Sequence, residues 1–248
     1  MKDDLGYEVS DAPVKRVVSL VPSITETVAQ IAPELLVGAT DYCVHPPDLD
    51  VYRVGGSKYP SMDKILQCRP DMVLANAEEN RKEDVEALRE AGIRCWVCFP
   101  RTTVQACDSA ARMIEALSLP QPDWIETAKT LWSAPAVTER RAVIPIWRKP
   151  WMVLGPDTFA GDVLRRLGVV NVFDDAAQPY PKVTLEQIRH KTPDLVILPD
   201  EPYRFTDDDG PGFFPQTQCA LVSGRHLTWH GPSLLEAYDL LRRQLRID

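Results

Sequence analysis

The sequence predicts an α/β protein with two Rossmann-like lobes, each built on a mostly parallel sheet, joined by one long backbone helix. Three observations support this fold class. Short apolar runs alternate with amphipathic segments in both halves of the chain. One helix–strand unit recurs in the two halves with the same spacing, and a long helical pattern separates the halves. Alternating strands and helices with short connections are typical of parallel sheets covered by helices.

The first half begins with a strand at 16–21 that ends at Pro22. Ser23 and Glu26 have the spacing of a capping box, which predicts that a helix begins at Ser23. A short strand at 36–39 and a proline-rich loop at 41–50 follow. The remaining elements expected in this half are a helix at 61–68, a strand at 71–75, a helix at 81–91 and a strand at 93–99.

A helical pattern then runs from Thr103 to Ala134, and Pro120 and Pro122 are expected to kink or split it. Alternation resumes after this stretch. The expected elements are a strand at 141–146, helices at 157–168 and 183–191, strands at 194–198 and 219–222, and a closing helix at 232–245. We therefore expect an N-terminal lobe at 1–102, a linking helix at 103–135 and a C-terminal lobe at 136–248.

The two halves share a motif. Tyr59-Pro, a helix and the run Pro70-Asp-Met-Val-Leu recur as Tyr180-Pro, a helix and Pro193-Asp-Leu-Val-Ile. The shared order and spacing favour two lobes of like structure. When two such lobes meet, the loops that follow the strands are the default place for a ligand, so we expect a binding cleft between the lobes.

Composition excludes several classes of function. The 248 residues carry a formal charge of −8, which argues against binding nucleic acid or an anionic membrane. No apolar run approaches the roughly 20 residues that span a bilayer. The N-terminal segment is polar and acidic, without the layout of a secretory signal, so we expect either a cytosolic chain or one whose signal was removed. Standard catalytic motifs are missing, and we expect no enzymatic activity.

The six cysteines are too sparse for a disulfide framework. Cys95 and Cys98 form a C-x-x-C sequence inside a predicted strand, where residues three apart point to opposite faces. We therefore interpret this pair as structural rather than as a redox or metal site.

Two of the four histidines are candidate ligands for a metal or a cofactor. His45 lies in the loop after the second predicted strand, and His230 lies between the last strand and the last helix. A metal-ligating histidine must be neutral and partly accessible, and a loop position meets that need. The alternative is that each imidazole only forms hydrogen bonds within its own loop. We interpret His190 as a surface residue and His226 as structural.

Aromatic residues near the predicted strand ends are a stronger signal. Flat side chains suit a large planar ligand, because they offer a wide contact area at low cost in conformational entropy. A loop aromatic can also simply cover the core. The candidates are Tyr42, Trp147, Trp151, Phe159, Tyr203 and Trp229.

Acidic residues also follow buried strands. Glu78 and Glu79 follow the strand at 71–75, and Glu201 follows the strand at 194–198. No nucleophile or complementary acid lies nearby in sequence, so we interpret them as solvated charges or as docking residues for a basic partner. The run at 207–209 reads as a solvated turn.

Several segments of this chain resemble the helical-backbone (class III) substrate-binding proteins of ABC importers, most of all their cobalamin-binding branch. The segments lie in the expected order and cover residues 14–245, nearly the whole chain. They are Val17–Thr27, Tyr42–Pro47, Pro70–Leu74, Phe159–Gly168, Asn171–Phe173 and Pro193–Ile197.

This resemblance implies two α/β lobes joined by a long helix, with little hinge motion and a ligand held between the lobes. It implies a ligand-binding role for Tyr42, His45, Trp151, Phe159 and Trp229, to which the strand-end loops add Tyr203 and His230. It also implies that a glutamate on each lobe meets arginines of the permease. Glu78 or Glu79 fits this role on the first lobe. The second lobe reads His-Gly-Pro after Trp229, without a glutamate, and Glu201 is a substitute.

We therefore expect a monomeric receptor, without an intrinsic cofactor, that delivers a corrinoid (cobalamin) or a related tetrapyrrole or metal chelate to an ABC importer. His45 or His230 would be an axial ligand to the metal. By resemblance the protein is periplasmic or extracellular, and cytoplasmic if the N-terminus is native. The alternatives are a receptor for iron–siderophore or metal ions, and a cytosolic protein that handles a metal or cofactor on the same fold.

Overall fold

The computed structural model of the protein describes residues 1–133 and 140–247. The chain divides into two compact units. Unit 1 comprises Met1–Pro100, Gln105–Glu126 and His230–Pro232, and unit 2 comprises Arg101–Val104, Thr127–Trp229 and Ser233–Asp248. The boundary expected between residues 135 and 136 lies outside the described residues. Among those that are described, no helix has the length and apolar character needed to cross a bilayer.

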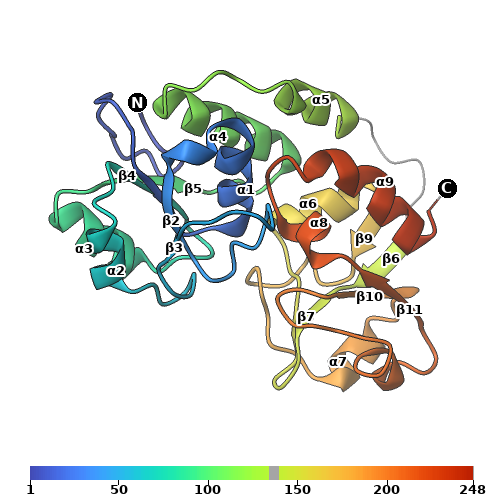
Figure 1. Ribbon diagram of the computed structural model, residues 1–248. Coiled ribbons are helices and arrows are strands. Elements are labelled where there is room, and N and C mark those ends of the chain that lie inside the picture. Colours follow the sequence, from blue (N-terminus) through green and yellow to red (C-terminus); the bar gives the residue numbers. More distant parts are fainter. Residues whose placement is uncertain (134–139, 248) are drawn as a thin grey trace. The chain divides into compact units, whose positions relative to one another are not determined.

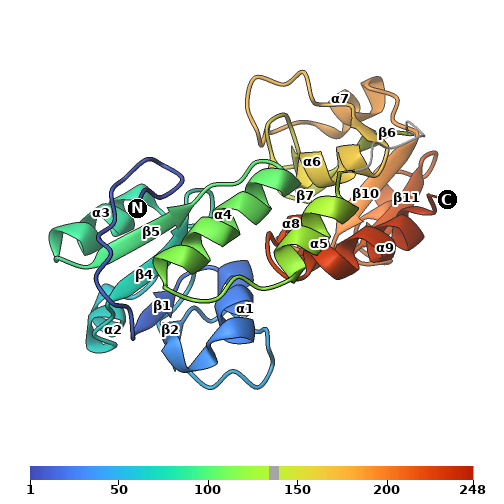
Figure 2. The same ribbon diagram turned by 90° about the horizontal axis from the view of Figure 1, so that it is seen from above.

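Unit 1 contains a five-stranded sheet with the order β3-β2-β1-β4-β5, in which every pairing is parallel. Figures 1 and 2 show α2 and α3 on one face of this sheet and α1 and α4 on the other. The strands are β1 (Val17–Ser19), β2 (Leu36–Ala39), β3 (Tyr52–Arg53), β4 (Met72–Asn76) and β5 (Arg94–Cys98). The helices are α1 (Pro22–Ile31), α2 (Met62–Gln67) and α3 (Lys82–Glu90), and a short 3-10 helix, η1, spans Pro33–Leu35.

Unit 2 contains a four-stranded parallel sheet with the order β11-β10-β6-β9, and β7 and β8 form a separate antiparallel hairpin. Figure 1 shows α7 on one side of the sheet and α6, α8 and α9 on the other. The strands are β6 (Arg140–Val143), β7 (Pro145–Trp147), β8 (Met152–Val153), β9 (Val169–Asn171), β10 (Leu195–Pro199) and β11 (Gln218–Val222). The helices are α6 (Phe159–Arg166), α7 (Leu185–His190), α8 (Gly224–Thr228) and α9 (Leu234–Leu245), with a 3-10 helix, η2, at Pro211–Phe213.

The two sheets repeat one plan. When β1 is matched with β6, β2 with β9, β4 with β10 and β5 with β11, the order β2-β1-β4-β5 becomes β9-β6-β10-β11. The recurring sequence motif occupies equivalent places, because α2 precedes β4 and α7 precedes β10. Arg69 and Thr192, which precede the two Pro-Asp pairs, both have a left-handed backbone, with φ of 45° and 46°. The predicted fold of two like parallel-sheet lobes is thereby confirmed.

The helical stretch after unit 1's sheet consists of two helices instead of one. α4 spans Thr103–Ala116 and α5 spans Trp124–Leu131. The break between them contains Pro120 and Pro122, because proline lacks the N–H that a helix needs and its ring clashes with the preceding turn. The split expected from these prolines is confirmed, whereas the continuous backbone helix is not what the described residues contain.

Each unit has its own apolar core. In unit 1 the core lies between the sheet and α2 and α3, and it includes Val18, Leu20, Ile65, Val73, Leu88 and Cys95. In unit 2 the core includes Val143, Val153, Ile188, Val196, Leu198 and Phe214. The central strands β4 and β10 are buried along their whole length, as expected for strands of a parallel sheet that is covered on both faces.

One predicted helix start is wrong. α1 begins at Pro22, and its N-cap is Val21 without a side-chain hydrogen bond, so Ser23 and Glu26 form no capping box. Proline is favoured in the first helical turn because its missing N–H has no partner there in any case. Ser23 instead lies inside the helix, where its hydroxyl approaches His230.

Short elements without a strong apolar period escaped sequence analysis. These are β3, β8, β9 and α8. The predicted helices at 61–68 and 81–91 are confirmed as α2 and α3. Ser61 caps α2 by accepting a hydrogen bond from the Lys64 N–H.

Candidate functional site

Parallel strands end at the same edge of a sheet, so the loops that follow them gather there. In unit 1 these loops follow β2 (residues 40–51), β3 (54–61) and β4 (77–81), and we name them the first loop set. In unit 2 we name the hairpin at 145–153, the loop after β10 (200–210) and the segment after β11 (223–229), which includes α8, the second loop set. All but one of the predicted ligand-binding and docking residues of unit 2 lie in the second set.

The loop after β2 is held by Arg53 on the neighbouring strand. Its guanidinium donates hydrogen bonds to the carbonyl oxygens of Thr40 at 3.0 Å, Cys43 at 2.8 Å and Leu49 at 3.2 Å. Cys43 is buried, and the hydroxyls of Thr25 and Thr40 lie within 3.0 and 3.1 Å of its sulfur. This loop therefore has a defined shape set by backbone contacts.

Two predicted ligand residues project from this loop. Tyr42 is 65% exposed. One of its ring carbons lies 3.6 Å from the position that a Cβ atom on Gly56 would occupy, so the ring lies beside the loop after β3. His45 is half-buried. The same loop thus carries an exposed aromatic ring and a half-buried imidazole, and side chains of these kinds can contact a flat ligand.

The loop after β4 is organised by two asparagines. The Asn76 Oδ1 accepts hydrogen bonds from the backbone N–H groups of Glu78, at 2.7 Å, and Glu79, at 3.3 Å. The Asn80 side chain accepts from the Asn76 N–H at 2.8 Å and donates to the carbonyl oxygen of Ser57 at 2.9 Å. These bonds tie the loop after β4 to the loop after β3. They fix the backbone of Glu78 and Glu79, both of which are half-buried.

His230 belongs to unit 1, although it lies late in the chain. It is buried, with 8% exposure, and its Nε2 lies 3.0 Å from Asn76 Nδ2 and 3.4 Å from the Ser23 hydroxyl. Burial lowers its pKa to about 4, so the imidazole is neutral near pH 7. The accessible loop position expected for His230 is wrong, because the side chain is enclosed by polar partners of unit 1.

Aromatic rings cluster around Trp151 of the hairpin in unit 2. Trp151 stacks on Phe205 at 6.1 Å and meets Phe213 and Phe214 edge-on at 5.3 and 5.6 Å. Tyr203 packs against Phe205 at 4.7 Å. Trp151 and Tyr203 are half-buried, so each contributes to the core and retains an open surface. Both predicted functions of these loop aromatics, covering the core and contacting a ligand, are compatible with this placement.

A charged network ties the hairpin to the loop after β10. Arg148 donates to the Tyr203 hydroxyl at 3.2 Å and to the Asp209 carboxylate at 2.9 Å, and the Tyr203 hydroxyl donates to Asp209 at 2.6 Å. The hydrogen bond from Tyr203, followed by those from Arg148, lowers the pKa of Asp209 although desolvation opposes it. The interpretation of 207–209 as a purely solvated turn is therefore wrong for Asp209.

Phe159 and Trp229 are more deeply placed than expected. Phe159 is 5% exposed at the start of α6, and Trp229 is 7% exposed, with the Arg225 guanidinium 5.4 Å from its ring. Glu201 is exposed as a residue, yet partial burial of its carboxyl group and the neighbouring charge of Asp200 raise its pKa. A hydrogen bond with Trp229 acts in the opposite direction.

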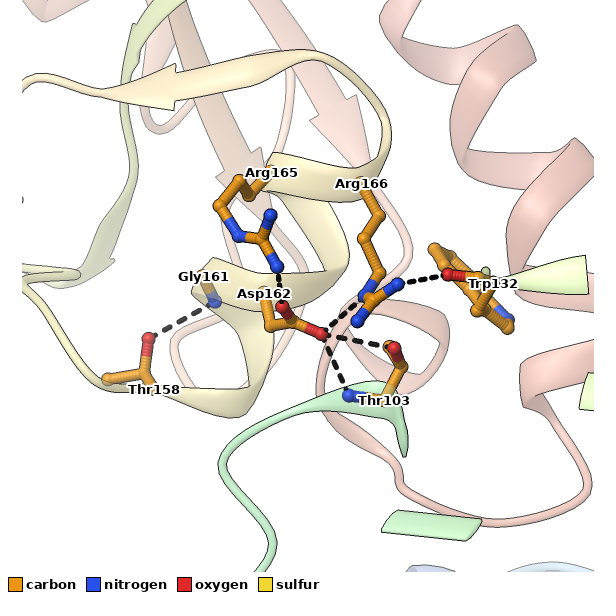
Figure 3. A network of polar contacts seen from close by, with 7 residues as sticks. All are labelled: Thr103, Trp132, Thr158, Gly161, Asp162, Arg165 and Arg166. Carbon is orange, nitrogen blue, oxygen red and sulfur yellow. Dashed lines mark hydrogen bonds and ion pairs between the residues drawn. The ribbon is translucent and has the colours of Figure 1, made fainter. Parts of the chain in front are cut away.

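A buried carboxylate, that of Asp162, anchors α6 (Figure 3), the helix that begins at Phe159. The Asp162 carboxylate accepts from the Thr103 N–H at 2.8 Å, the Thr103 hydroxyl at 3.0 Å and Arg166 at 2.8 Å, and it also pairs with Arg165. Burial alone would raise the pKa of Asp162, but the hydrogen bonds from Thr103 and the two arginines outweigh it, and the pKa is lowered. Thr158 caps the helix by accepting from the Gly161 N–H at 3.1 Å.

Metal-ligating side chains are not clustered in the part of the chain that the structure describes. Within residues 1–133 and 140–247, no three His, Cys, Asp or Glu side chains are grouped so that they could hold a metal ion. The sulfur of Cys95 lies 3.9 Å from the Val85 carbonyl of α3, and that of Cys98 lies 3.9 Å from the Met113 sulfur of α4. Burial raises the pKa of these thiols to about 11 and about 12. The two sulfurs therefore point to opposite faces of the sheet, as the strand position predicts.

The other two histidines lie on helices of unit 2, His190 on α7 and His226 on α8. His190 is exposed at the end of α7, whereas His226 is buried, 2.8 Å from the Ser223 hydroxyl and 3.2 Å from Glu236. A hollow of about 370 Å³ is lined by Phe173, Glu186, Gln187, His190 and Lys191. A second, of about 410 Å³, is lined by Met1, Lys2, Glu8, Val9 and Ser10.

Sequence analysis missed the polar residues that shape both loop sets, namely Arg53, Asn76, Asn80, Arg148 and Asp209. Their signals were weak. Asn76 directly follows an apolar run and Asn80 comes four residues later, and Arg148 stands with Lys149 and Pro150 between Trp147 and Trp151.

Comparison with known proteins identifies relatives of this chain, although no protein-family model matches it. The vitamin B12-binding protein of Vibrio cholerae serotype O1 is 26% identical over 194 residues, which cover 75% of this chain and 70% of that protein. The crystal structure of the periplasmic vitamin B12 binding protein BtuF of Vibrio cholerae matches with a TM-score of 0.73 and 21% identity, over 95% of this chain and 98% of that one.

A periplasmic heme binding protein from Pseudomonas aeruginosa has a similar fold. It matches with a TM-score of 0.73 and 20% identity, over 94% of each chain. The fold extends over nearly the whole of both chains in these structural matches, which excludes a local likeness of single helix–strand units. The chain is therefore a homologue of the vitamin B12-binding proteins and has the class III binding-protein fold.

Proposed function

We propose that this protein is the substrate-binding protein of an ABC importer and that it binds a corrinoid, such as cobalamin, or a related tetrapyrrole. The observation that carries the proposal is the similarity to vitamin B12-binding proteins over three quarters of the chain. The loops at the carboxyl ends of the strands in the two units would contact the ligand. The protein would act by binding and delivery rather than by catalysis.

The first loop set would supply two kinds of contact to such a ligand. A corrin or porphyrin ring is flat and largely apolar, and the 65% exposed ring of Tyr42 offers it a stacking surface. His45, on the same loop and half-buried, is the histidine that we assign as the axial ligand of the ligand's metal. His230 is a poorer candidate because its side chain is buried, with 8% exposure, whereas His45 is half-buried.

Titration of the purified protein with hydroxocobalamin and haemin tests this function. We expect a saturable change in the corrin or Soret absorbance at micromolar protein. We further expect His45→Ala to change the shape of the absorption band of the bound metal, because an axial ligand is lost, while Tyr42→Ala weakens binding without that spectral change. Unchanged spectra with both ligands would refute the proposal.

The alternatives predict other outcomes of the same titration. A receptor for an iron–siderophore or a metal ion would show a metal-dependent thermal shift without any response to a tetrapyrrole. The curated relatives favour the corrinoid.

We also propose that Glu78 and Glu79 of unit 1 and Glu201 of unit 2 dock to the basic surface of a permease, and that the protein works in the periplasm, as the named relatives do. The backbone of Glu78 and Glu79 is fixed by Asn76, which would present both carboxylates in a defined place. A Glu78→Lys, Glu79→Lys double variant should bind the ligand as the wild type does and fail to support uptake in cells. Normal uptake would exclude these two residues as docking contacts.

A further inference from the structure

Trp147 is the most exposed tryptophan assigned to the second loop set. It ends strand β7 and is 42% exposed, while Trp229 is only 7% exposed and Trp151 is half-buried in the aromatic cluster. A single exposed aromatic ring is common on protein surfaces and by itself indicates little. What distinguishes Trp147 is the structure built directly behind it.

The residue that follows Trp147 is held at three points. The Arg148 side chain is only 17% exposed, and it donates to the Tyr203 hydroxyl and the Asp209 carboxylate. Its guanidinium also lies 5.0 Å from the centre of the Phe213 ring. Hydrogen bonds between charged partners are stronger than those between neutral ones, so this network stabilises the hairpin end more than ordinary loop contacts would.

The same network determines how the indole lies. The Trp147 and Tyr203 rings are 5.5 Å apart and nearly perpendicular, at 78°. The Tyr203 hydroxyl is fixed by its 2.6 Å hydrogen bond to Asp209, so the ring against which Trp147 leans is itself held. The charges of Arg148 and Asp209 cancel, which makes the network a brace rather than a binding site for an anion.

We propose that Trp147 is a ligand-contacting residue of the second loop set, and that Arg148, Tyr203 and Asp209 are positioning residues that hold its indole ready for a tetrapyrrole plane. This inference rests on the proposed function and adds to it a contact in unit 2. A ring that is already ordered loses little conformational entropy when the ligand binds, so a pre-positioned tryptophan raises affinity. Tyr203 thereby changes from an expected contact to a support.

A double-mutant cycle with hydroxocobalamin and haemin as probes tests the inference. Trp147→Ala should weaken binding about tenfold, as expected for the loss of one stacked ring. Tyr203→Phe keeps the ring and removes only the hydroxyl, and it should weaken binding about threefold in the wild-type background. In the Trp147→Ala background the same change should not alter the affinity, because the indole ring that the hydrogen-bond network positions is no longer present.

The control variants distinguish a positioning role of the Arg148, Tyr203 and Asp209 network from a general loss of structure. Asp209→Asn should behave as Tyr203→Phe does, whereas Asp208→Asn, at the exposed neighbouring position, should bind as the wild type does. If the wild type binds neither probe, the proposed function fails and this inference fails with it. If the wild type binds and Trp147→Ala binds equally well, the inference alone is overturned. Additive effects of Tyr203→Phe and Trp147→Ala would overturn the positioning role.

Discussion

The imidazole Nε2 of His230 lies 3.0 Å from the side-chain nitrogen of Asn76, at the end of strand β4. The orientation of that amide is set by its oxygen, which accepts the Glu78 N–H. The amide nitrogen is therefore the donor and Nε2 the acceptor, which leaves the proton of the neutral imidazole on Nδ1. His230, which lies 154 positions after Asn76 in the chain, thus completes the group of hydrogen-bonded side chains at the start of the loop after β4.

This arrangement predicts a pH dependence of stability. Burial lowers the pKa of His230 to about 4 from its usual 6.5, so the unfolded chain binds this proton more readily than the folded protein does. The neutral His230 side chain therefore makes its full contribution to the free energy of unfolding above the pKa that it has in the unfolded chain. This contribution is lost as the pH falls towards its pKa in the folded protein. Between about pH 7.5 and about pH 5 the free energy of unfolding should decrease by about 2 kcal/mol. Urea unfolding at the two pH values measures the change.

The matched variants for this experiment are His230→Asn and His190→Asn. The first retains a hydrogen-bonding side chain that does not titrate, and the pH dependence should shrink. His190 is exposed at the end of α7, and its replacement should leave the wild-type slope. Equal slopes in His230→Asn and the wild type would contradict the assignment.

Asp162→Asn should lower the stability of unit 2. The carboxylate has a side-chain exposure of only 5%, and it neutralises two arginines while it accepts both the N–H and the hydroxyl of Thr103. Removing one partner of a buried ion pair leaves the other charge uncompensated, at a cost of about 3 kcal/mol. Thermal unfolding should show a midpoint several degrees below that of the wild type. Asp208→Asn, on an exposed turn, is the control, and an equal melting point for the two variants would refute the role of the network.

Thr192→Gly should make the protein more stable. Thr192 has a φ of 46°, a conformation that is unfavourable for a side chain branched at Cβ by about 1 to 2 kcal/mol. Glycine adopts it freely but loses more backbone entropy on folding, by about 0.5 to 1 kcal/mol, so a net gain of about 0.5 to 1 kcal/mol is expected. Denaturant unfolding measures it. Thr184→Gly, at an N-cap with φ of −96°, should give no gain.

Tyr42→Ala should reduce affinity for hydroxocobalamin about tenfold, provided that the proposed function is correct. The ring is exposed and is not part of either apolar core, so its loss should leave the melting temperature unchanged. Tyr52→Ala is the comparison, because Tyr52 is 48% exposed on β3 and lies outside the predicted ligand residues. A loss of affinity in both variants would indicate a nonspecific effect of removing surface tyrosines. Isothermal titration distinguishes these outcomes.

The parts of the fold that sequence analysis predicted are those with strong local signals. Strands β4 and β10 are unbroken apolar runs, and both follow a Pro-Asp pair. The short strands β3, β8 and β9 escaped because two or three residues carry no readable period, and pairing with a neighbour decides their conformation. The capping box at Ser23 and Glu26 failed because Pro22 already starts the helix.

The candidate site was only partly predictable for a related reason. Loop aromatics such as Tyr42 are visible in the sequence, and so is their place after a strand. Whether a loop residue is exposed depends on partners far away in the chain. His230 is buried by Asn76, which lies 154 positions earlier, and Asp209 is fixed by Arg148, 61 positions earlier. No local pattern encodes such pairs.

The return of His230–Pro232 to unit 1 has a consequence for biosynthesis. Gly231 fits this slot closely, because a Cβ there would lie 2.9 Å from the Ser23 carbonyl oxygen. This segment follows β11 of unit 2 in the chain, so a ribosome must release residues 127–229 before unit 1 can finish folding. The halves of this molecule are consequently not separable by a single cut of the gene, however alike their sheets are.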